Sequence, residues 1–339
     1  MATNTRVTEK RTNIKRIFGR TVVLFLAALI TVDGAWADPT FIDLTHEIPT
    51  FAPMKDDPLK PDLAKPIGNS TPIAGFYHQA ILYPSDKWAT SDGHFNSAAF
   101  LIQEHNGTSF NSPNHYVNNI GSLEHGGIPP NQRKSAEELT IEQLTGKIVL
   151  IDVSKRVRDE LAKNDGKPSS DKSITDFSDS SQATVRSQDI EAVADKIDDG
   201  IWLIARLGWE QFYSSGIEDW DTSPYVNALN HPGFSREAID KLIAIMDTKG
   251  VKISGIAADS FSTDSGEGAK GTDDKWSNAW PAHVRLYQRD ILIVENLANL
   301  GALADAVRTS SQCFLVVGAS KHVGGTGGPA RVVAVCESE

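Results

Sequence analysis

Short apolar runs recur along this chain of 339 residues, and they constrain its fold more than any other feature. The runs lie at residues 41–46, 78–83, 98–103, 148–153, 201–205, 251–256, 291–294, 314–317 and 331–335. Most of them lack the alternation of apolar and polar residues that marks a half-exposed strand. The pattern therefore predicts strands that are covered on both faces.

Helical signals lie between several of these runs. Ser135, with Glu138 three residues later, forms a capping pattern before a short apolar segment, and residues 188–197 give a second helical signal. Ser235 can cap a third helix over residues 235–246. The apolar stripe of that helix is expected to pack in the core, and it consists of Ile239, Leu242, Ile243 and Met246.

Three segments have little apolar periodicity. The Pro-rich stretch from Pro49 to Pro66 is expected to be an extended arm or lid, and the polar residues 163–182 a surface excursion. Residues 324–328 are rich in glycine but lack the Lys-Ser/Thr ending of a phosphate loop and precede a strand. We interpret them as a tight connection near the floor of the functional site.

Residues 1–37 have the composition of a secretory signal peptide. They combine six basic side chains, an apolar run from Thr21 to Val32, and small residues before a cleavage point after Ala37. The alternative, a membrane anchor, is less favoured because this run is shorter than the roughly 20 residues that cross a bilayer. We therefore expect a signal peptide at 1–37, one domain at 38–339, no stable membrane anchor after cleavage, and a periplasmic or secreted location.

Charge and cysteine content narrow the possible partners. Removal of residues 1–37, which hold six basic and two acidic side chains, changes the net charge from −11 to −15. Such an acidic chain is not expected to bind nucleic acid. Cys313 and Cys336 each lie at the end of an apolar run, so a disulfide is possible if those ends are neighbours, and two buried thiols are the alternative.

Residues 105–115 form a dense polar segment with the sequence HNGTSFNSPNH. Gly107 and Pro113 favour turns, so this segment should direct side chains rather than fill a core. His105 or His115 alone could be an ordinary surface or core histidine. Their presence together in one Gly/Pro segment favours a functional role.

Glu295 directly follows the apolar run 291–294. A carboxylate at the end of a buried strand needs a partner, which could be a metal ion or an arginine such as Arg285 or Arg331. His283 lies twelve positions earlier. Imidazole and carboxylate side chains bind divalent metals and can leave one coordination position open for water, so metal-assisted hydrolysis is the predicted chemistry.

The same residues resemble the signature of the bacterial cyclase family of metal-dependent hydrolases, which includes kynurenine formamidases (arylformamidases) and isatin hydrolases. The signature is His-x-Gly-Thr-His-x-Asp-x-Pro-x-His. This chain keeps its first His, Gly, Thr, Pro and last His, and it has Ser109 and Asn111 in place of the second His and the Asp. Further segments that fit the family lie at 43–46, 207–209, 231–235, 259–260, 283, 295–300 and 324–331.

The resemblance implies an α/β fold, a layered single domain with a mixed β-sheet or barrel-like core and outer helices, assembled into homodimers or larger homo-oligomers. It also implies one or two zinc or manganese ions, with ligands from His105, Ser109, Asn111, His283 and Glu295. The neutral Ser109 and Asn111 should weaken zinc binding and leave a harder, oxygen-rich ligand set. A one-metal site built from His105, His283 and Glu295 is the simplest arrangement that remains.

The predicted mechanism uses metal-activated water, with His115 as the general base. Thr108 is expected to contact the small-molecule substrate, and Phe76, Tyr77 and Trp88 to cover it, although these aromatic residues could equally serve packing or oligomer contacts. Ser109 as a nucleophile is disfavoured because no Gly-x-Ser-x-Gly elbow surrounds it.

Three interpretations remain. The first is an exported hydrolase that opens an amide or lactone bond in a small, cyclic or aromatic substrate. The second is a catalytically silent relative that binds a small molecule or a metal, and the third is an oligomeric structural protein. The hydrolase, and a silent relative that still holds a metal, require His105, His283 and Glu295 to converge, and the hydrolase also requires His115 beside them.

Overall fold

The computed structural model describes residues 38–47, 51–53, 61–66, 79–83, 97–101, 104–115, 133–213, 223–266 and 280–337. All of them belong to one compact unit, Asp38–Glu339. The predicted signal peptide, 1–37, lies outside the described residues. Within the described part of the chain, none of the helices has the length and apolar character needed to cross a membrane.

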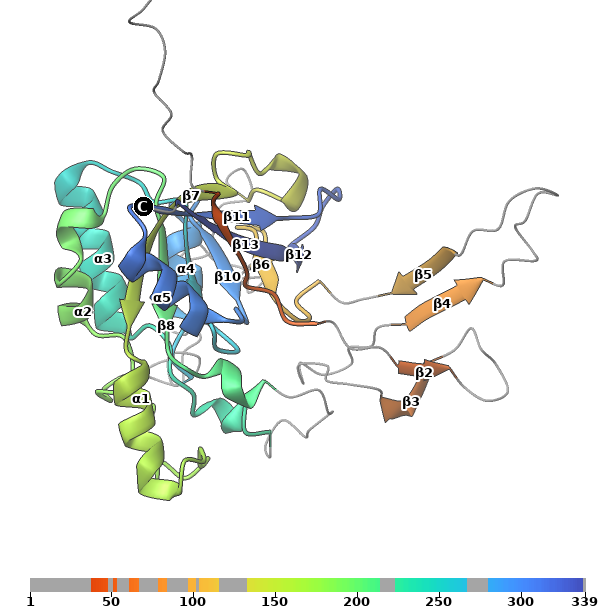
Figure 1. Cartoon of the computed structure of the whole chain (residues 1–339), viewed down its shortest axis with the longest axis horizontal. Coiled ribbons are helices and arrows are strands. Elements are labelled where there is room, and N and C mark those ends of the chain that lie inside the picture. The colour runs from red at the N-terminus through yellow and green to blue at the C-terminus, as the bar shows by residue number, and fades with distance from the viewer. Residues whose placement is uncertain are drawn as a thin grey trace, which may run out of the picture. The chain divides into compact units, whose positions relative to one another are not determined.

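Nine strands form one mixed sheet in the order β1-β13-β11-β7-β8-β9-β10-β6-β12 (Figure 1). Their bounds are β1 Thr40–Asp43, β6 Ser109–Asn111, β7 Thr145–Asp152, β8 Trp202–Arg206, β9 Gly255–Ala258, β10 Leu292–Glu295, β11 Cys313–Gly318, β12 Gly327–Pro329 and β13 Arg331–Cys336. Strands β7 to β10 run parallel, whereas the pairings at both ends of the sheet are antiparallel. The mixed sheet confirms the predicted fold class.

The described helices and the remaining strands complete the fold. The α-helices are α1 Ser154–Leu161, α2 Ser187–Glu191, α3 Arg236–Lys249, α4 Pro281–Tyr287 and α5 Leu300–Thr309. Short 3₁₀ helices span Ala136–Glu138, Ala162–Asn164, Ala194–Lys196, Glu210–Phe212 and Asn227–Leu229. Two antiparallel pairs, β2 (Phe51–Pro53) with β3 (Pro61–Pro66) and β4 (Gln79–Tyr83) with β5 (Ser97–Leu101), form separate two-stranded sheets. The Pro-rich stretch thus includes a short hairpin that periodicity did not predict.

Alternating residues of the central strands fill two cores. In β8, Leu203 and Ala205 belong to the core under α1 to α4, whereas Trp202 and Ile204 belong to the core under α5. Figure 1 shows α2 and α3 side by side on the first of these faces. Burying a side chain such as Leu203 stabilises the fold by about 1.5–3 kcal/mol relative to leaving it exposed. The absence of simple alternation in the sequence therefore reflects burial on both faces, as predicted.

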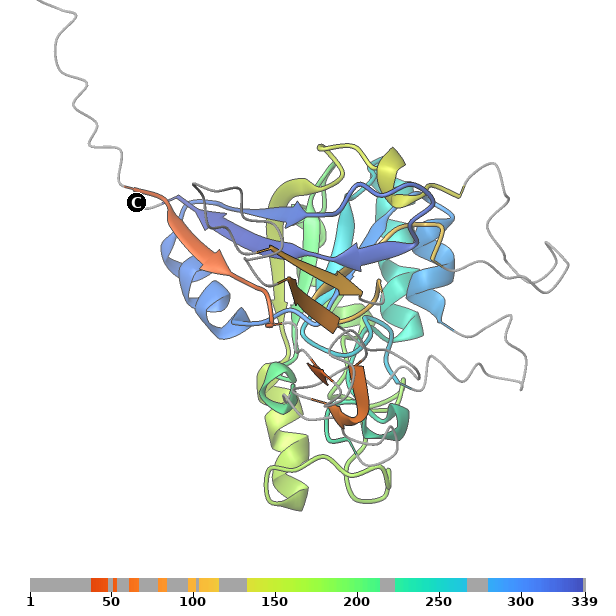
Figure 2. The same cartoon turned by 90° about the vertical axis from the view of Figure 1, so that its right-hand side faces the viewer.

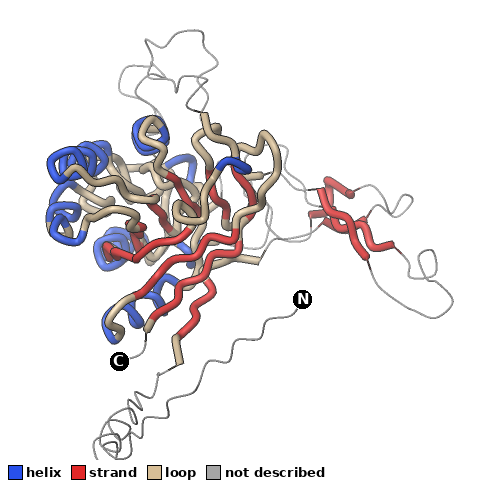
Figure 3. The backbone as a smooth tube through the Cα atoms, turned by 90° about the horizontal axis from the view of Figure 1, so that it is seen from above, coloured by secondary structure: helices blue, strands red, loops and turns tan. Residues whose placement is uncertain are grey.

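The sheet curls at its β1 end, because side chains of β11 and β13 share the second core with those of β8 and β10. Figure 2 shows β11 and β13 running together, and Figure 3 shows paired strands side by side near the C-terminus. Cys313 and Cys336 are direct partners on β11 and β13, with Cα atoms 4.0 Å apart, and they form a disulfide. Of the two alternatives left open by the sequence, the structure therefore contains the bridge.

The best local prediction concerns α3. The Ser235 hydroxyl accepts a hydrogen bond from Ala238 N, and Gly250, at φ 68°, ends the helix in the left-handed region. The predicted strand at 251–256 is displaced, since β9 begins only at Gly255. A Cβ atom at Gly255 would lie 2.4 Å from the Trp202 ring, so glycine is required for this packing.

Candidate metal centre

Strands β6 and β10 build the floor of the site. They pair antiparallel, with Ser109 opposite Glu295, Phe110 opposite Val294 and Asn111 opposite Ile293. Because side chains alternate along a strand, Ser109, Asn111 and Glu295 face the same side of the sheet, while Phe110 enters the opposite core. Sequence reasoning treated residues 109–111 as part of a loop and did not predict this three-residue strand.

Glu295 is buried, and its partners are polar groups of the site. Its Oε2 atom accepts a hydrogen bond from Asn111 Nδ2 at 2.8 Å, and its Oε1 accepts one from the Thr263 amide at 3.0 Å. His283 Nε2 lies 3.4 Å from the same Oε1. The alternative partners proposed from the sequence are engaged elsewhere, since Arg285 pairs with Asp240 and Arg331 with Asp43.

His283 is held in the first turn of α4 by Asp264, a residue that sequence reasoning missed. The Asp264 carboxylate accepts hydrogen bonds from the backbone amide of Ala282 and from Nδ1 of His283, at 2.7 and 2.6 Å. Because an ionised carboxylate only accepts, Nδ1 carries a hydrogen, and Nε2 is the ring nitrogen that faces Glu295. Burial lowers the pKa of His283, but Asp264 and Glu295 outweigh it, and the pKa is raised.

His105 has partners at both ring nitrogens. Its Nδ1 lies 2.6 Å from Asn111 Oδ1, and its Nε2 lies 2.9 Å from Thr326 Oγ1. Burial lowers its pKa below the usual value. Gly327 of β12 packs directly beneath the ring, where a Cβ atom would lie 2.6 Å from Cε1. The glycine-rich segment therefore lies against the candidate site, as we interpreted it.

The His115 ring lies beside that of His105, with the ring centroids 3.7 Å apart, and its centroid is 5.9 Å from that of His283. Burial, followed by the neighbouring His105 and His283, lowers the pKa of His115 well below its usual value. A neutral imidazole at this place can accept a proton. The geometry is compatible with the predicted proton-transfer role, which stays a prediction.

The remaining predicted substrate contacts fall in different places. The Thr108 hydroxyl donates to the Asn296 carbonyl at 2.5 Å and accepts from the His46 amide at 2.9 Å, so it joins the loop to the turn after β10. Its contact with a substrate stays a prediction. Phe76, Tyr77 and Trp88 lie outside the described residues.

The donor set fits one divalent ion only if neutral side chains take part. Among the described residues, no three His, Cys, Asp or Glu side chains are arranged to share a metal. His283 Nε2 and Glu295 Oε1, however, are separated by 3.4 Å, about the edge of a tetrahedron with metal–ligand distances of ~2.1 Å. The Ser109 hydroxyl beside them is fully buried without a hydrogen-bond partner. A bound ion or a water molecule would satisfy this hydroxyl, so the set is compatible with a weak, oxygen-rich site.

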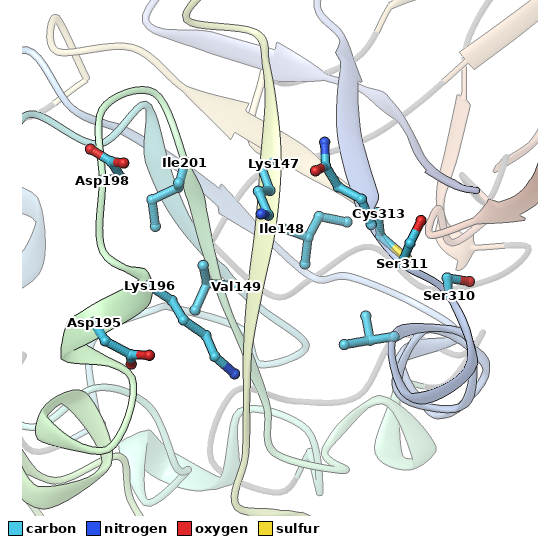
Figure 4. Close-up of a pocket in the computed structure, with 12 residues that line it drawn as sticks. Lys147, Ile148, Val149, Asp195, Lys196, Asp198, Ile201, Ser310, Ser311 and Cys313 are labelled. Carbon is cyan, nitrogen blue, oxygen red and sulfur yellow. The ribbon is translucent and has the colours of Figure 1, made fainter. Parts of the chain in front are cut away.

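Two surface cavities of about 450 and 530 Å³ lie elsewhere. The first, shown in Figure 4, is lined by Lys147, Lys196 and Ser311 among others. It borders the first residues of β7, whereas Glu295 is the last residue of the parallel strand β10. Ligands of α/β sheets bind at the carboxyl ends of strands, so we do not assign this cavity to the candidate chemistry.

Comparisons with known proteins identify the family and the fold of this chain. The model of the family described as Putative cyclase matches residues 42–265, more than half of the chain. The chain belongs to this family. A comparison with curated proteins gives no match.

Solved structures of isatin hydrolases have a similar fold. One, bound to the product analogue thioisatinate, gives a TM-score of 0.57 at 22% identity over 94% of this chain and 100% of its own. Isatin hydrolase A from Labrenzia aggregata, bound to benzyl benzoate, gives 0.55 at 24% identity over 93% and 98%. Isatin hydrolase A from Ralstonia solanacearum gives 0.57 at 20% identity over 95% and 100%. At these low sequence identities, the comparison shows that the folds are similar and nothing further.

Proposed function

We propose that this protein is a metal-dependent hydrolase that opens an amide C–N or lactone bond in a small, cyclic or aromatic substrate. The observation that carries the proposal is the approach of His283 Nε2 to Glu295 Oε1 beside the unpartnered Ser109 hydroxyl. The membership of the cyclase family and the likeness in fold to isatin hydrolases support the substrate class.

In the proposed site, His283 and Glu295 hold one zinc or manganese ion, and His105, Ser109 and Asn111 complete its surroundings. When bound, the ion supplies Lewis acidity and lowers the pKa of a water molecule to about 7. His115 removes a proton from the attacking water and returns it to the leaving nitrogen or oxygen. The Ser109 hydroxyl can donate to the oxygen on which negative charge develops. The nearly complete burial of His283 and Glu295 strengthens these interactions by excluding solvent.

The expected assembly and location belong to the same proposal. The chain would be exported, cleaved after Ala37, and would act in the periplasm or outside the cell as a homodimer or larger homo-oligomer. A second candidate function is a silent relative that binds a small molecule or metal without turnover. It is favoured by the two neutral side chains, Ser109 and Asn111, at the centre of the donor set.

Elemental analysis of purified residues 38–339 tests the proposal, before and after reconstitution with zinc or manganese. His283→Ala should abolish metal binding, whereas Arg285→Ala, on the same helix but paired outward with Asp240, is the matched control and should retain it. Metal-loaded protein is then assayed with formamides, isatin-like lactams and lactones. Absence of metal after reconstitution overturns the hydrolase proposal, and bound metal without turnover of any substrate favours the silent relative.

A further inference from the structure

We propose that the outer face of β1, β11 and β13 is the surface through which two copies of this chain associate, with their β13 strands antiparallel. The inference assigns a surface to the homo-oligomer expected above. It depends on neither the metal site nor turnover, so the association and the proposed chemistry can be tested separately.

Exposed apolar side chains gather on this face. Among the described residues, six large apolar side chains are exposed, and three of them belong to β1 and β11: Phe41 (67%), Phe314 (37%) and Val316 (39%). On β13, which lies between these strands, Val335 is directly opposite both Phe41 and Phe314. Val333 is directly opposite Val316. Cross-strand partners share a face, so these five side chains form one continuous surface, which we call the outer patch.

The outer patch points away from both cores. Leu315 and Val317 of β11, and Val332 of β13, belong to the core under α5, and side chains that alternate with them along a strand point to the opposite face. Neither Val333 nor Val335 packs against either core. The exposed area of the patch is roughly 300 Å², a size at which apolar patches on single chains are often functional. A specific interface buries about 800 Å² on each partner, so the patch can form its apolar centre.

The order of charges along β13 indicates the occupant. The outward side chains of this strand are, in sequence, Arg331, Val333, Val335 and Glu337, and they alternate with buried residues. The amide of Glu337 donates to the Gln312 carbonyl at 2.9 Å, so the pairing with the chain of β11 extends to this residue. The outer face of the strand therefore carries a basic, two apolar and an acidic side chain in that order.

A second copy of the same chain matches this pattern. A twofold axis that crosses β13 near Ala334 places the two strands antiparallel, with valines facing valines and Arg331 of each copy facing Glu337 of the other. In such an interface every contact occurs twice, which requires a self-complementary surface. Asp43 holds the Arg331 guanidinium at this face through two hydrogen bonds, at 3.0 and 2.6 Å. Opposite charges at the two ends of one apolar patch favour a second copy over a partner of uniform charge.

Sedimentation velocity of the purified protein over a dilution series measures the Kd of association. Phe314→Lys places a charge at the apolar centre and should raise the Kd at least ~100-fold. Phe41→Lys makes the same change on the edge strand β1, where the side chain is more exposed. Val323→Lys is the matched control, because Val323 is 88% exposed and lies outside the outer patch, and its Kd should equal that of the unmodified protein.

Charge reversal tests the antiparallel arrangement. Arg331→Glu and Glu337→Arg should each raise the Kd at least ~10-fold, because like charges then meet at both ends of the patch. A mixture of the two variants should associate again, since a copy with two acidic ends then meets a copy with two basic ends. A merely structural role of either residue would not produce this recovery.

The outcomes decide the inference directly. A protein that stays monomeric at every concentration overturns it, and so does association that Phe314→Lys leaves unchanged, because another surface would then be used. Weakened association without recovery in the mixture also overturns the antiparallel arrangement proposed. Thermal unfolding identifies a variant that does not fold, and Phe41→Lys decides if Phe314→Lys is such a variant. Metal content measured on the same samples reports on the proposed function independently.

Discussion

Protonation of His231 should destabilise the fold in mild acid. The side chain is fully buried, its Nδ1 lies 3.2 Å from the Pro232 carbonyl, and its Nε2 has no hydrogen-bond partner. Burial lowers the pKa to about 4, although the Pro232 carbonyl and the charge of Asp264 act in the opposite direction. A proton at Nε2 would therefore be charged and unpaired inside the core.

The sign and size of the effect follow from the two pKa values. The pKa is 6.5 in the unfolded chain and about 4 in the folded protein, so the folded state favours neutral His231. The part of the folding stability that depends on neutral His231 is fully present above about pH 6.5 and is lost as the pH falls toward 4. A difference of this size corresponds to about 3 kcal/mol when complete and about 2 kcal/mol at pH 5. That is a large part of a typical stability of about 5–15 kcal/mol.

Urea unfolding of metal-free protein at pH 7.5 and pH 5.0 measures this effect, since removal of metal avoids acid-driven release of the ion. His231→Asn keeps an amide nitrogen near the position of Nδ1 and removes the titration. Between the two pH values, the unmodified protein should lose about 2 kcal/mol more than the variant. His46, whose pKa burial also lowers to about 4, titrates in both proteins and cancels in the comparison. Equal losses in both proteins would refute the reasoning.

Three further predictions concern the disulfide and the site. Replacing Cys313 and Cys336 by Ala should lower the free energy of unfolding by about 3 kcal/mol, because the bridge closes a segment with a sequence separation of 23; an unchanged urea midpoint would contradict this. Asp264→Asn should weaken metal binding about 10–100-fold by releasing His283, and unaltered affinity in chelator competition would argue against the orientation assigned to its ring. Ser109→His combined with Asn111→Asp should increase zinc affinity at least ~10-fold, and elemental analysis after dialysis would detect the opposite result.

The strands were predicted best where apolar residues are buried on both faces. The runs at 148–153, 201–205, 291–294, 314–317 and 331–335 correspond to β7, β8, β10, β11 and β13. The run at 251–256 was displaced because Ile253 is buried without belonging to a strand, and burial alone leaves the same apolar signal. Strands β6 and β12 could not be predicted, because each has only three residues, mostly polar or glycine, and pairs only with strands that are distant in sequence.

Polar composition was a poor guide to burial in residues 163–182. The expected surface excursion contains Phe177, which is fully buried, and Thr175, which is also inaccessible. Asn230 organises this segment by donating to the carbonyls of Ser169 and Thr175 and accepting from the Phe177 amide. Side-chain hydrogen bonds from a distant residue order the segment, and such tertiary contacts leave no periodic pattern in the sequence.

The sequence predicted which residue types form the site, but not the residues that hold its histidines in place. His283 and Glu295 lie close together because α4 ends in the loop that enters β10, and residue chemistry alone suggested the pairing. Asp264, Thr326 and Glu104 were missed because an acidic or hydroxyl residue in a turn has many ordinary roles. Only the folded chain shows that each of them contacts a histidine of the site, directly or through one hydroxyl.

Asn111 determines how far the site depends on a metal ion. An aspartate at this position would place a second carboxylate 2.8 Å from Glu295, and two such charges require a cation or a shared proton between them. The amide instead donates to Glu295, so this part of the site is satisfied without metal. Its oxygen faces His105 Nδ1 at hydrogen-bond distance, 2.6 Å. The exchange of Asp for Asn therefore removes one of two adjacent negative charges and with it the need for a cation beside Glu295. The metal-free protein should consequently stay folded.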